Sequence, residues 1–295
     1  MTELLRVGWL GLGAMGAPMA SRLMAGGFRV AAYDPHPPAG LDMSIGANAA
    51  DVARNADVLC LMVADAEQLE LALFGRDGAA DALPPWAVVV VFCTVGPDAV
   101  RAAAARLPQE LLDAPVSGGP ARAARGDLVA MTSGENAAAS AALPLLAVLA
   151  SQVEHFGRDP GTGQAVKMVN QLLAGVHLAA AAEALVLAER LGLPADRVLS
   201  LLQHGAAGSF MLADRGPRML APQPATAASA VDIFTKDMGL VLAVAGSVGA
   251  ATPLTEAAST AFRKCAAMGH GRADDSQVIL AYRDATLHPA GSPPT

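Results

Sequence analysis

Residues Val7–Gly16, with the sequence VGWLGLGAMG, join a short apolar run to a glycine-rich turn. The glycines have the spacing GxGxxG, and the stretch that follows, Met15–Ala25, has the apolar pattern of an amphipathic helix. Between a strand and a helix, the first glycine makes a tight turn, the second admits a pyrophosphate and the third allows close packing. The motif alone is a weak signal, but this setting predicts a dinucleotide site made by Gly11, Leu12, Gly13, Ala14, Met15 and Gly16.

An acidic residue stands at the end of the next predicted strand. Asp34 follows Arg29–Tyr33 and comes eighteen residues after Gly16. A carboxylate at this place can accept hydrogen bonds from the ribose hydroxyls of adenosine, and it repels a 2′-phosphate. The next residues, Pro35–Pro37, supply no arginine that would bind such a phosphate. The sequence therefore predicts NAD as the cofactor rather than NADP.

Apolar runs and helical stretches alternate through the first half of the chain. The predicted strands are Val7–Leu10, Arg29–Tyr33, Val58–Met62, Ala87–Phe92, Leu111–Ala114, Val129–Thr132 and a short one near Val153–Phe156. Helical patterns separate them, among them Ala49–Asn55, Pro97–Arg106 and Asn136–Leu149. Strands that are apolar almost throughout belong to a sheet covered on both faces. We therefore expect an α/β fold with an N-terminal Rossmann-type doubly wound sheet.

The second half of the chain is helical in pattern. Strand signals end at Gly161–Gly163, and helices are predicted at Gln164–Leu191, Asp196–Leu202, Ala230–Val248 and Pro253–Met268. A chain of 295 residues is long enough to bury two cores. We expect an NAD-binding domain in residues 1–163, an all-helical domain for substrate binding and oligomerisation in 164–285, and a disordered tail in 286–295.

Composition and charge limit the classes of function. A net charge of −7 without any basic run disfavours nucleic-acid binding. The 3 cysteines are widely separated and form no CxxC pair or Cys/His cluster, so we expect neither a metal site nor a disulfide framework. The apolar run Leu172–Ala188 contains His177 and Glu183, which favours a buried helix over a membrane span. The N-terminus lacks a signal-peptide pattern, which predicts a cytoplasmic protein.

Lysine is rare in this chain. Only Lys167, Lys236 and Lys264 occur among 20 basic residues. Unlike an arginine, a lysine can act as a base when burial or a nearby positive charge lowers its pKa. Lys167 lies in the first turns of the long predicted helix, and Asn170 and Gln171 follow on the same side at i+3 and i+4. Taken alone, this spacing still leaves a solvated surface lysine as the favoured interpretation.

Four stretches of the chain resemble the signature regions of the β-hydroxyacid dehydrogenase family. In chain order they are GLGAMGAPMASRL from Gly11, DAPVSGGPARAARGDLVAMTSG from Asp113, GTGQAVKMVNQLLAG from Gly161 and FTKDMGLVLA from Phe234. The resemblance extends from Val7 to about Tyr282. It implies an NAD-dependent oxidoreductase that transfers a hydride between the cofactor and the hydroxyl-bearing carbon of a small hydroxy acid.

The resemblance also implies roles for single residues around the substrate. Lys167 matches the family's catalytic lysine, which would accept the hydroxyl proton in oxidation and return it in reduction. Asn170 matches a substrate-binding asparagine. Ser117, Gly118 and Gly119 match the loop that binds the substrate carboxylate, a role suited to a hydroxyl and unobstructed backbone N–H groups. Without the resemblance, these three residues read equally well as an ordinary turn after a strand.

Further positions match the lining of the cofactor site. Thr94 matches a Ser/Thr near the nicotinamide, and Met62 and Val63 match the segment after the third predicted strand that lines the cofactor. Lys236 matches a lysine that approaches cofactor or substrate. The chain departs from the family at Gln171, where many members have a second asparagine, and after Leu61, where the usual Leu-Pro is absent. Imine reductases share this architecture but generally replace the lysine, so Lys167 argues against imine reduction.

Two of the stretches that resemble the family also indicate a substrate class. NQLLAGVHLAAAAEA from Asn170 and SAVDIFTKDMGL from Ser229 are most similar to the branch of the family that oxidises four-carbon sugar acids such as L-threonate at the 2-hydroxyl. Oxidation of 3-hydroxyisobutyrate and reduction of tartronate semialdehyde (2-hydroxy-3-oxopropionate) use the same loop and lysine, and both stay open. A non-catalytic nucleotide-binding scaffold is the alternative from another class; the intact lysine and Ser-Gly-Gly loop argue against it.

Three more expectations concern the second domain. His177 belongs to the similarity with that branch, but a histidine that packs against another helix is at least as good an interpretation. His204, Ser209 and Phe210 fall in a loop-like stretch that is a candidate cap over the pocket. The apolar character of this domain predicts a homodimer or a homotetramer.

Overall fold

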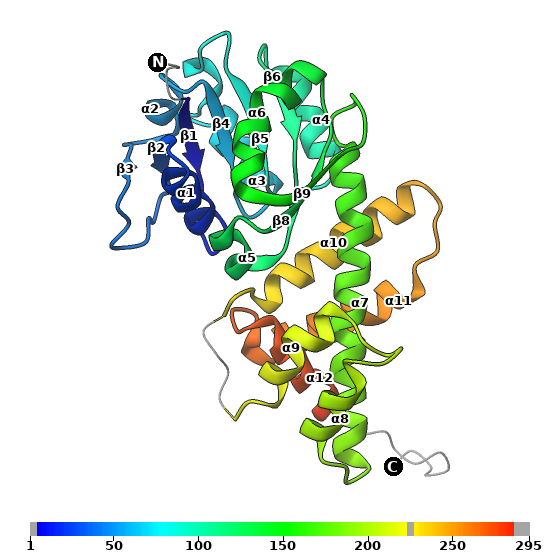
Figure 1. The fold of residues 1–295 in the computed structure, drawn as a ribbon. Coiled ribbons are helices and arrows are strands. Elements are labelled where there is room, and N and C mark those ends of the chain that lie inside the picture. Colours follow the sequence, from blue (N-terminus) through cyan, green and yellow to red (C-terminus); the bar gives the residue numbers. More distant parts are fainter. Residues whose placement is uncertain (1–4, 223–226, 286–295) are drawn as a thin grey trace. The chain divides into compact units, whose positions relative to one another are not determined.

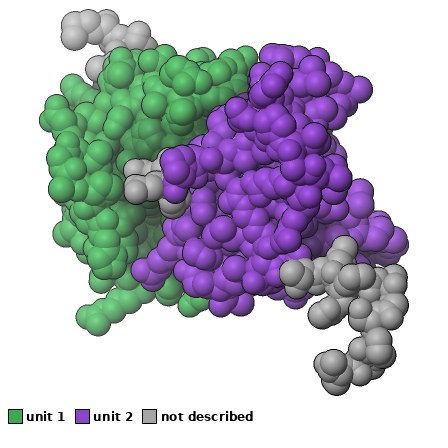
Figure 2. All heavy atoms as spheres, turned by 90° about the horizontal axis from the view of Figure 1, so that it is seen from below, with its two compact units in different colours: residues 1–168 green, residues 169–295 purple. Residues whose placement is uncertain are grey.

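The computed structural model describes residues 5–222 and 227–285. The tail predicted at 286–295 lies outside the described residues, as does most of the proline-rich stretch around residue 223. The chain separates into two compact units, Met1–Met168 and Val169–Thr295, which Figure 2 colours separately. The division falls inside one long helix, α7 (Thr162–Arg190), whose first turns belong to the first unit.

The first unit is built on a sheet of six parallel strands in the order β3-β2-β1-β4-β5-β6 (Figure 1). The strands are β1 (Arg6–Leu10), β2 (Arg29–Tyr33), β3 (Ser44–Ile45), β4 (Val58–Leu61), β5 (Val88–Val91) and β6 (Glu110–Asp113). Between β1 and β4 the strand order reverses, and dinucleotides bind at this point of a Rossmann fold. The predicted doubly wound sheet is confirmed.

Helices cover both faces of this sheet. One face carries α1 (Gly16–Ala25) and α6 (Asn136–Leu149), and the other carries α2 (Ala49–Ala53), α3 (Ala66–Phe74) and α4 (Pro97–Arg106). A short 3₁₀ turn, Ala80–Ala82, follows α3. Because side chains of a strand alternate between faces, Val88 and Val90 belong to the first core cluster, whereas Val89 and Val91 belong to the second.

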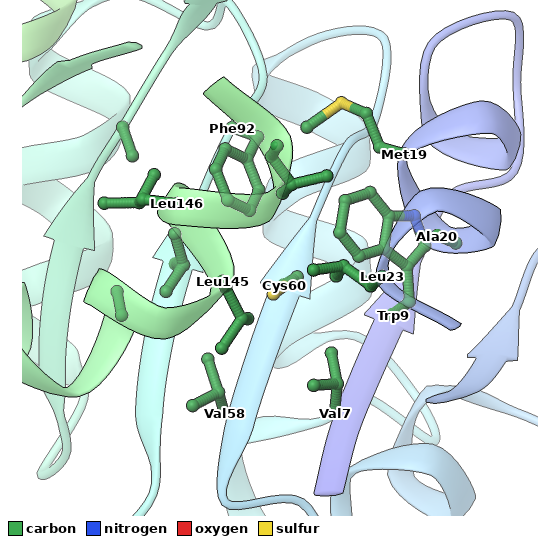
Figure 3. Packing of buried hydrophobic residues seen from close by; sticks show 14 of the residues in the cluster. Val7, Trp9, Met19, Ala20, Leu23, Val58, Cys60, Phe92, Leu145 and Leu146 are labelled. Carbon is green, nitrogen blue, oxygen red and sulfur yellow. The ribbon is translucent and has the colours of Figure 1, made fainter. Parts of the chain in front are cut away.

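The core next to the glycine-rich turn contains the largest buried side chains. Trp9 of β1 stacks on Phe92 with 5.7 Å between ring centroids, and Met19 and Leu23 of α1 lie beside it (Figure 3). The indole Nε1 of Trp9 donates a hydrogen bond to the carbonyl of Gly11 at 2.8 Å. The core therefore fixes the start of the turn as well as the helix that follows it.

A second, three-stranded sheet completes the first unit. It contains β7 (Val116–Ser117), β8 (Leu128–Thr132) and β9 (Ala150–His155), and the helix α5 (Gly119–Arg125) connects β7 to β8. Asp113 and Ser133 form an antiparallel bridge with N–H···O distances of 2.9 and 2.8 Å, which joins β6 to the end of β8. Neither β7 nor α5 was predicted, because their two and seven residues are too short for a periodic pattern.

The second unit is helical, as predicted. After α7 it contains α8 (Ala195–Leu202), α9 (Phe210–Leu220), α10 (Val231–Ser247), α11 (Pro253–Cys265), a π turn at Ala266–His270, a 3₁₀ turn at Asp275–Val278 and α12 (Ile279–Arg283). A side chain on Gly175 of α7 would collide with Met238 of α10, so this glycine permits the two helices to pack closely. A buried ion pair of 3.0 Å joins Arg215 of α9 to Asp275.

One sequence interpretation in this unit is wrong. Ser209 and Phe210 do not lie in a loop, because Ser209 caps α9 and Phe210 is its first residue. The Ser209 hydroxyl accepts the backbone N–H of Leu212 at 3.0 Å, the usual role of a serine at a helix N-terminus. The glycines before Ser209 and the proline inside α9 hid this helix in the sequence.

The helix α7 is also the one element, among the described residues, that is long and apolar enough to cross a membrane by length and composition. Half of its most apolar window is buried inside the structure. A core helix of a globular protein passes the same test, since it is apolar on more than one face.

Candidate active site

The three glycines of the turn after β1 have different surroundings. Gly11 has a φ of 96°, and a side chain on it would collide with the carbonyl of Met62. A side chain on Gly16 would collide with the carbonyl of Gly11, whereas one on Gly13 would meet no atom within 4 Å. Gly11 and Gly16 are therefore required by the packing of the protein itself. Gly13 borders open space next to the N-terminus of α1, the surroundings that an approaching pyrophosphate needs.

The carboxylate of Asp34 connects this turn to the end of β2. One of its oxygens accepts the backbone N–H of Leu12 at 2.7 Å, and the other accepts that of His36 at 2.8 Å. Each carboxylate oxygen can accept two hydrogen bonds, so lone pairs remain on this half-buried group. These lone pairs fit the ribose hydroxyls of a dinucleotide, and the glycine turn fits its phosphates.

Other predicted cofactor residues lie at the same carboxyl edge of the sheet. Met62 and Val63 follow β4, Thr94 follows β5, and all three are half-buried. Asp65, a little further along the chain, is the N-cap of α3, where its carboxylate accepts the backbone N–H of Gln68 at 2.8 Å.

A buried hydrogen-bond network that the sequence did not reveal lies next to Thr94. The side-chain oxygen of Gln164 accepts the backbone N–H groups of Val95 and Gly96 at 3.0 and 3.1 Å. Its side-chain nitrogen donates to the carbonyl of Cys93 and to the carboxylate of Asp113, both at 2.9 Å. The start of α7 is therefore bound to the loop after β5 and to the end of β6.

Asp113 is the acidic centre of this network. Besides Gln164, it accepts hydrogen bonds from the backbone N–H of Gly161 at 3.1 Å, the backbone N–H of Gln164 at 2.8 Å and the Ser133 hydroxyl at 3.3 Å. Burial raises the pKa of this carboxyl to about 6, although the hydrogen bonds from Gln164, Ser133 and Gly161 oppose the rise. Asp113 and Gln164 both stood in the quoted motifs, but no sequence pattern indicates that residues 51 positions apart are partners.

Lys167 lies one helical turn after Gln164. Only 5% of its surface is exposed, so the interpretation of a solvated surface lysine is wrong. A buried lysine is unusual in a protein, and burial favours its uncharged form.

The Ser-Gly-Gly loop lies at the junction of β7 and α5. Ser117 is paired with Val129 of β8, which fixes its backbone. Gly118 and Gly119 have φ values of 145° and 77°, a region that residues with side chains rarely adopt. A side chain on Gly119 would meet no atom within 4 Å, so the backbone of this glycine is accessible to a ligand.

Four polar side chains of the second unit form a continuous chain of contacts. The amide nitrogen of Asn170 donates to the Gln171 side-chain oxygen at 2.8 Å, and the Gln171 nitrogen donates to the Asp237 carboxylate. The same carboxylate forms an ion pair of 2.9 Å with Lys236. The replacement of a second asparagine by the longer Gln171 therefore has a function inside the protein, since it joins α7 to α10.

The two histidine candidates, His177 and His204, belong neither to the hydrogen-bond network of Asp113 and Gln164 nor to the chain of polar contacts around Gln171. His177 is exposed on α7, so its interpretation as a helix-packing residue is wrong. His204 is exposed after α8, with its ring 3.3 Å from the side chain of Gln203. Among the described residues, no three His, Cys, Asp or Glu side chains are grouped so that they could hold a metal ion. The three cysteines, Cys60, Cys93 and Cys265, are all buried.

The fold, the glycine turn and the carboxylate at the end of β2 define a dinucleotide-binding protein of the Rossmann class. Comparison with known proteins agrees. Residues 6–157 match the NAD-binding domain of 6-phosphogluconate dehydrogenase, and residues 161–282 match the NAD-binding domain of NADP-dependent 3-hydroxyisobutyrate dehydrogenase. Together the two matches cover both units.

Individual relatives match over almost the whole length. An L-threonate dehydrogenase of Cupriavidus necator is 42% identical over 94% of this chain and 95% of its own, and that of Escherichia coli K12 is 38% identical over 97% of both. The crystal structure of a 3-hydroxyisobutyrate dehydrogenase from Salmonella typhimurium has a TM-score of 0.86, 37% identity, and coverage of 94% and 99%. The chain belongs to the 3-hydroxyisobutyrate dehydrogenase-like family of NAD-binding hydroxy-acid dehydrogenases.

Proposed function

We propose that this enzyme oxidises a four-carbon sugar acid, L-threonate or a close relative, at its 2-hydroxyl, with NAD as the hydride acceptor. The observation that carries the proposal is the 42% identity with an L-threonate dehydrogenase over 94% of the chain. The buried Lys167 and the accessible Ser-Gly-Gly backbone support it, because the reaction needs a proton acceptor and an anion site. A related acid with the same carboxylate and neighbouring hydroxyl is handled by the same groups.

In this proposal Lys167 moves the proton. Bound NAD supplies the hydride acceptor, and the glycine turn, Asp34, Met62, Val63 and Thr94 are the residues that would hold it. The uncharged amine of Lys167 accepts the proton of the substrate hydroxyl while the hydride leaves the carbon that bears this hydroxyl. In the reverse direction the ammonium returns the proton to the carbonyl oxygen.

Other residues orient the substrate. The Ser117 hydroxyl and the backbone N–H groups of Gly118 and Gly119 bind its carboxylate. Asn170 presents its side-chain oxygen to a substrate hydroxyl, because its nitrogen is already donated to Gln171. Lys236 is held by Asp237 and adds positive charge for cofactor or substrate. In this division of roles, the first domain, residues 1–163, binds NAD, and residues 164–285 provide the rest of the substrate site.

The test is a screen for NADH formation with L-threonate, D-threonate, D-erythronate, D-glycerate and 3-hydroxyisobutyrate. We expect the highest kcat/KM with a four-carbon acid. A highest value with 3-hydroxyisobutyrate would assign the activity named for the Salmonella structure instead, and tartronate semialdehyde with NADH tests the reductive alternative. If every acid is inert while NAD binds, the chain is a nucleotide-binding scaffold and the proposal is wrong.

We also propose that the enzyme is a cytoplasmic homo-oligomer. Val169, Leu173 and Leu187 are exposed on α7, with 62%, 50% and 59% of their surfaces accessible. Their spacing puts them on one face of the helix, and an apolar face of this kind is suited to burial against a second copy. Light scattering after size exclusion tests this: the wild type should be a dimer or tetramer, and Leu173→Glu/Leu187→Glu should shift it towards the monomer.

A further inference from the structure

The buried amide of Gln164 uses all of its hydrogen-bonding capacity. Its oxygen accepts from the backbone N–H of Val95 and of Gly96, and its nitrogen donates to the carbonyl of Cys93 and to Asp113. A reversed amide would turn its NH₂ group towards two N–H donors and its oxygen towards a carbonyl and a carboxylate. Only one orientation of this side chain is therefore compatible with its surroundings.

Asp113 caps the start of α7 from the end of a neighbouring strand. The first N–H groups of a helix have no partners within the helix and must find them elsewhere. Here the Asp113 carboxylate accepts the N–H groups of Gly161 and Gln164, and the Ser133 hydroxyl accepts that of Gly163 at 2.9 Å. The start of the helix is consequently attached to β6 and to the end of β8 rather than to its own preceding loop.

This arrangement connects two groups that the proposed reaction requires. Cys93, Val95 and Gly96 surround Thr94, the predicted nicotinamide neighbour, and Lys167 lies at i+3 from Gln164 on the same side of α7. A displacement of Gln164 would shift the Thr94 loop and the lysine at the same time. All of these residues belong to the first unit.

We propose that Gln164 and Asp113 are positioning residues: together they fix the amine of Lys167 relative to the Thr94 loop. The inference rests on the proposed function, since it takes Lys167 as the catalytic residue. A polar network is a costly way to fill a fully buried site, because both groups lose their hydration and apolar side chains of equal size pack there at lower cost. What the polar network adds is a single geometry, which proton transfer requires.

An exchange of the two functional groups tests this role. In Asp113→Asn the new NH₂ group faces the NH₂ of Gln164, and in Gln164→Glu the new carboxylate faces that of Asp113. The double variant Asp113→Asn/Gln164→Glu restores a donor–acceptor pair between the two positions, with the polarity reversed. We expect each single variant to lower kcat by about 10- to 100-fold, with the KM of the acid changed much less. The double variant should recover at least part of this loss.

Two measurements that do not depend on turnover, hydrogen exchange and the binding of NADH, accompany the kinetics. Hydrogen exchange at the Val95 and Gly96 amides should become faster in Gln164→Met, because both lose their acceptor. The dissociation constant of NADH, measured by fluorescence, should change less than kcat. Gln164→Met also serves where the charged variant fails to fold, since it keeps the shape of the side chain without adding charge; its kcat should fall by about tenfold or more.

The matched control is a second buried glutamine of the same unit. Gln109 is 7% exposed and donates its side-chain nitrogen to the carbonyls of Leu83 and Pro84, away from the Thr94 loop. Gln109→Met should lower the melting temperature as Gln164→Met does, but leave kcat and the exchange of Val95 and Gly96 unchanged. Equal losses of kcat in the two variants would mean that Gln164 acts only through stability, and the inference would be wrong.

The outcome for Lys167 separates this inference from the proposed function. If Lys167→Ala keeps normal turnover, the proposed mechanism fails together with the positioning role. If Lys167→Ala is inactive while a folded Gln164→Met keeps its kcat, only the inference is overturned. If the losses of the two single variants simply multiply in the double variant, the restored pair has no effect and the inference is likewise overturned.

Discussion

The carboxylate of Asp34 accepts the backbone N–H of Leu12 at 2.7 Å, so the residue predicted to select the cofactor also holds the turn that binds it. In Asp34→Asn, the side-chain oxygen keeps this bond, but the NH₂ group then faces the N–H of His36. We expect KM for NAD to rise by about tenfold, since a hydrogen bond to a charged group contributes about 1.5–3 kcal/mol. The ratio of kcat/KM for NADP to that for NAD should increase, because the repulsion of a 2′-phosphate is removed; an unchanged ratio contradicts the assignment.

Replacement of Lys167 by alanine should lower kcat by about 10²- to 10⁴-fold, the usual contribution of a general acid or base. The NADH dissociation constant should stay near the wild-type value, because the glycine turn and Asp34, which are proposed to hold the cofactor, are unchanged. Lys264→Ala is the control. This lysine forms an ion pair with Asp284 at 2.9 Å on the surface of the second unit, and its loss should leave kcat unchanged. Normal turnover of Lys167→Ala would remove it from the mechanism.

Gly163→Ala should destabilise the first unit. The added Cβ would lie 2.5 Å from the carbonyl of Met131 and 2.9 Å from the carboxylate of Asp113. That carboxylate oxygen is held by hydrogen bonds from Gly161, Gln164 and Ser133, so it cannot move without weakening them. Overpacking of this kind costs about 1–3 kcal/mol. Gly246→Ala in α10 is the matched substitution, since a Cβ there meets nothing within 4 Å. Chemical denaturation should show Gly246→Ala to be neutral or stabilised by about 0.5–1 kcal/mol.

The raised pKa of Asp113, about 6 against an ordinary value of 3.8, makes stability depend on pH. Between these two values the folded protein binds more protons than the unfolded chain, so the contribution of Asp113 to stability falls as pH rises from about 4 to about 6. The total change is about 3 kcal/mol. We expect the free energy of unfolding of the wild type minus that of Asp113→Asn to fall by most of this amount between pH 4 and pH 7. A difference that is constant with pH would show that Asp113 does not titrate there.

Gln171→Asn tests the contact between α7 and α10. The shorter side chain cannot reach Asp237 and leaves that buried carboxylate with fewer partners, at a cost of about 1–3 kcal/mol. Asn170 also loses its acceptor at Gln171, so its orientation is no longer fixed. KM for the hydroxy acid should rise by more than kcat falls. A drop in melting temperature with unchanged KM would limit Gln171 to a structural role.

The sequence alone does not show which side chains of a helix the folded chain buries. Lys167 looked like a candidate surface lysine on spacing alone, and His177 looked like a packing residue; the structure reverses both, with Lys167 5% exposed and His177 exposed. Burial depends on which segments cover a helix face, and a long helix that is apolar on several faces does not indicate this. Only the resemblance to the family favoured Lys167 in advance.

The sequence by itself determined the class of fold and the cofactor turn. The strand–turn–helix at Val7–Ala25, the carboxylate at Asp34 and the alternation of strands and helices are local patterns, because hydrophobic periodicity and turn chemistry act over a few residues. Only the tertiary structure decided that Asp113 caps α7, that Gln164 joins it to the loop around Thr94, and that Gln171 reaches Asp237. These partners lie between 51 and 69 positions apart, and a buried polar atom takes whichever partner the folded chain brings within hydrogen-bond distance.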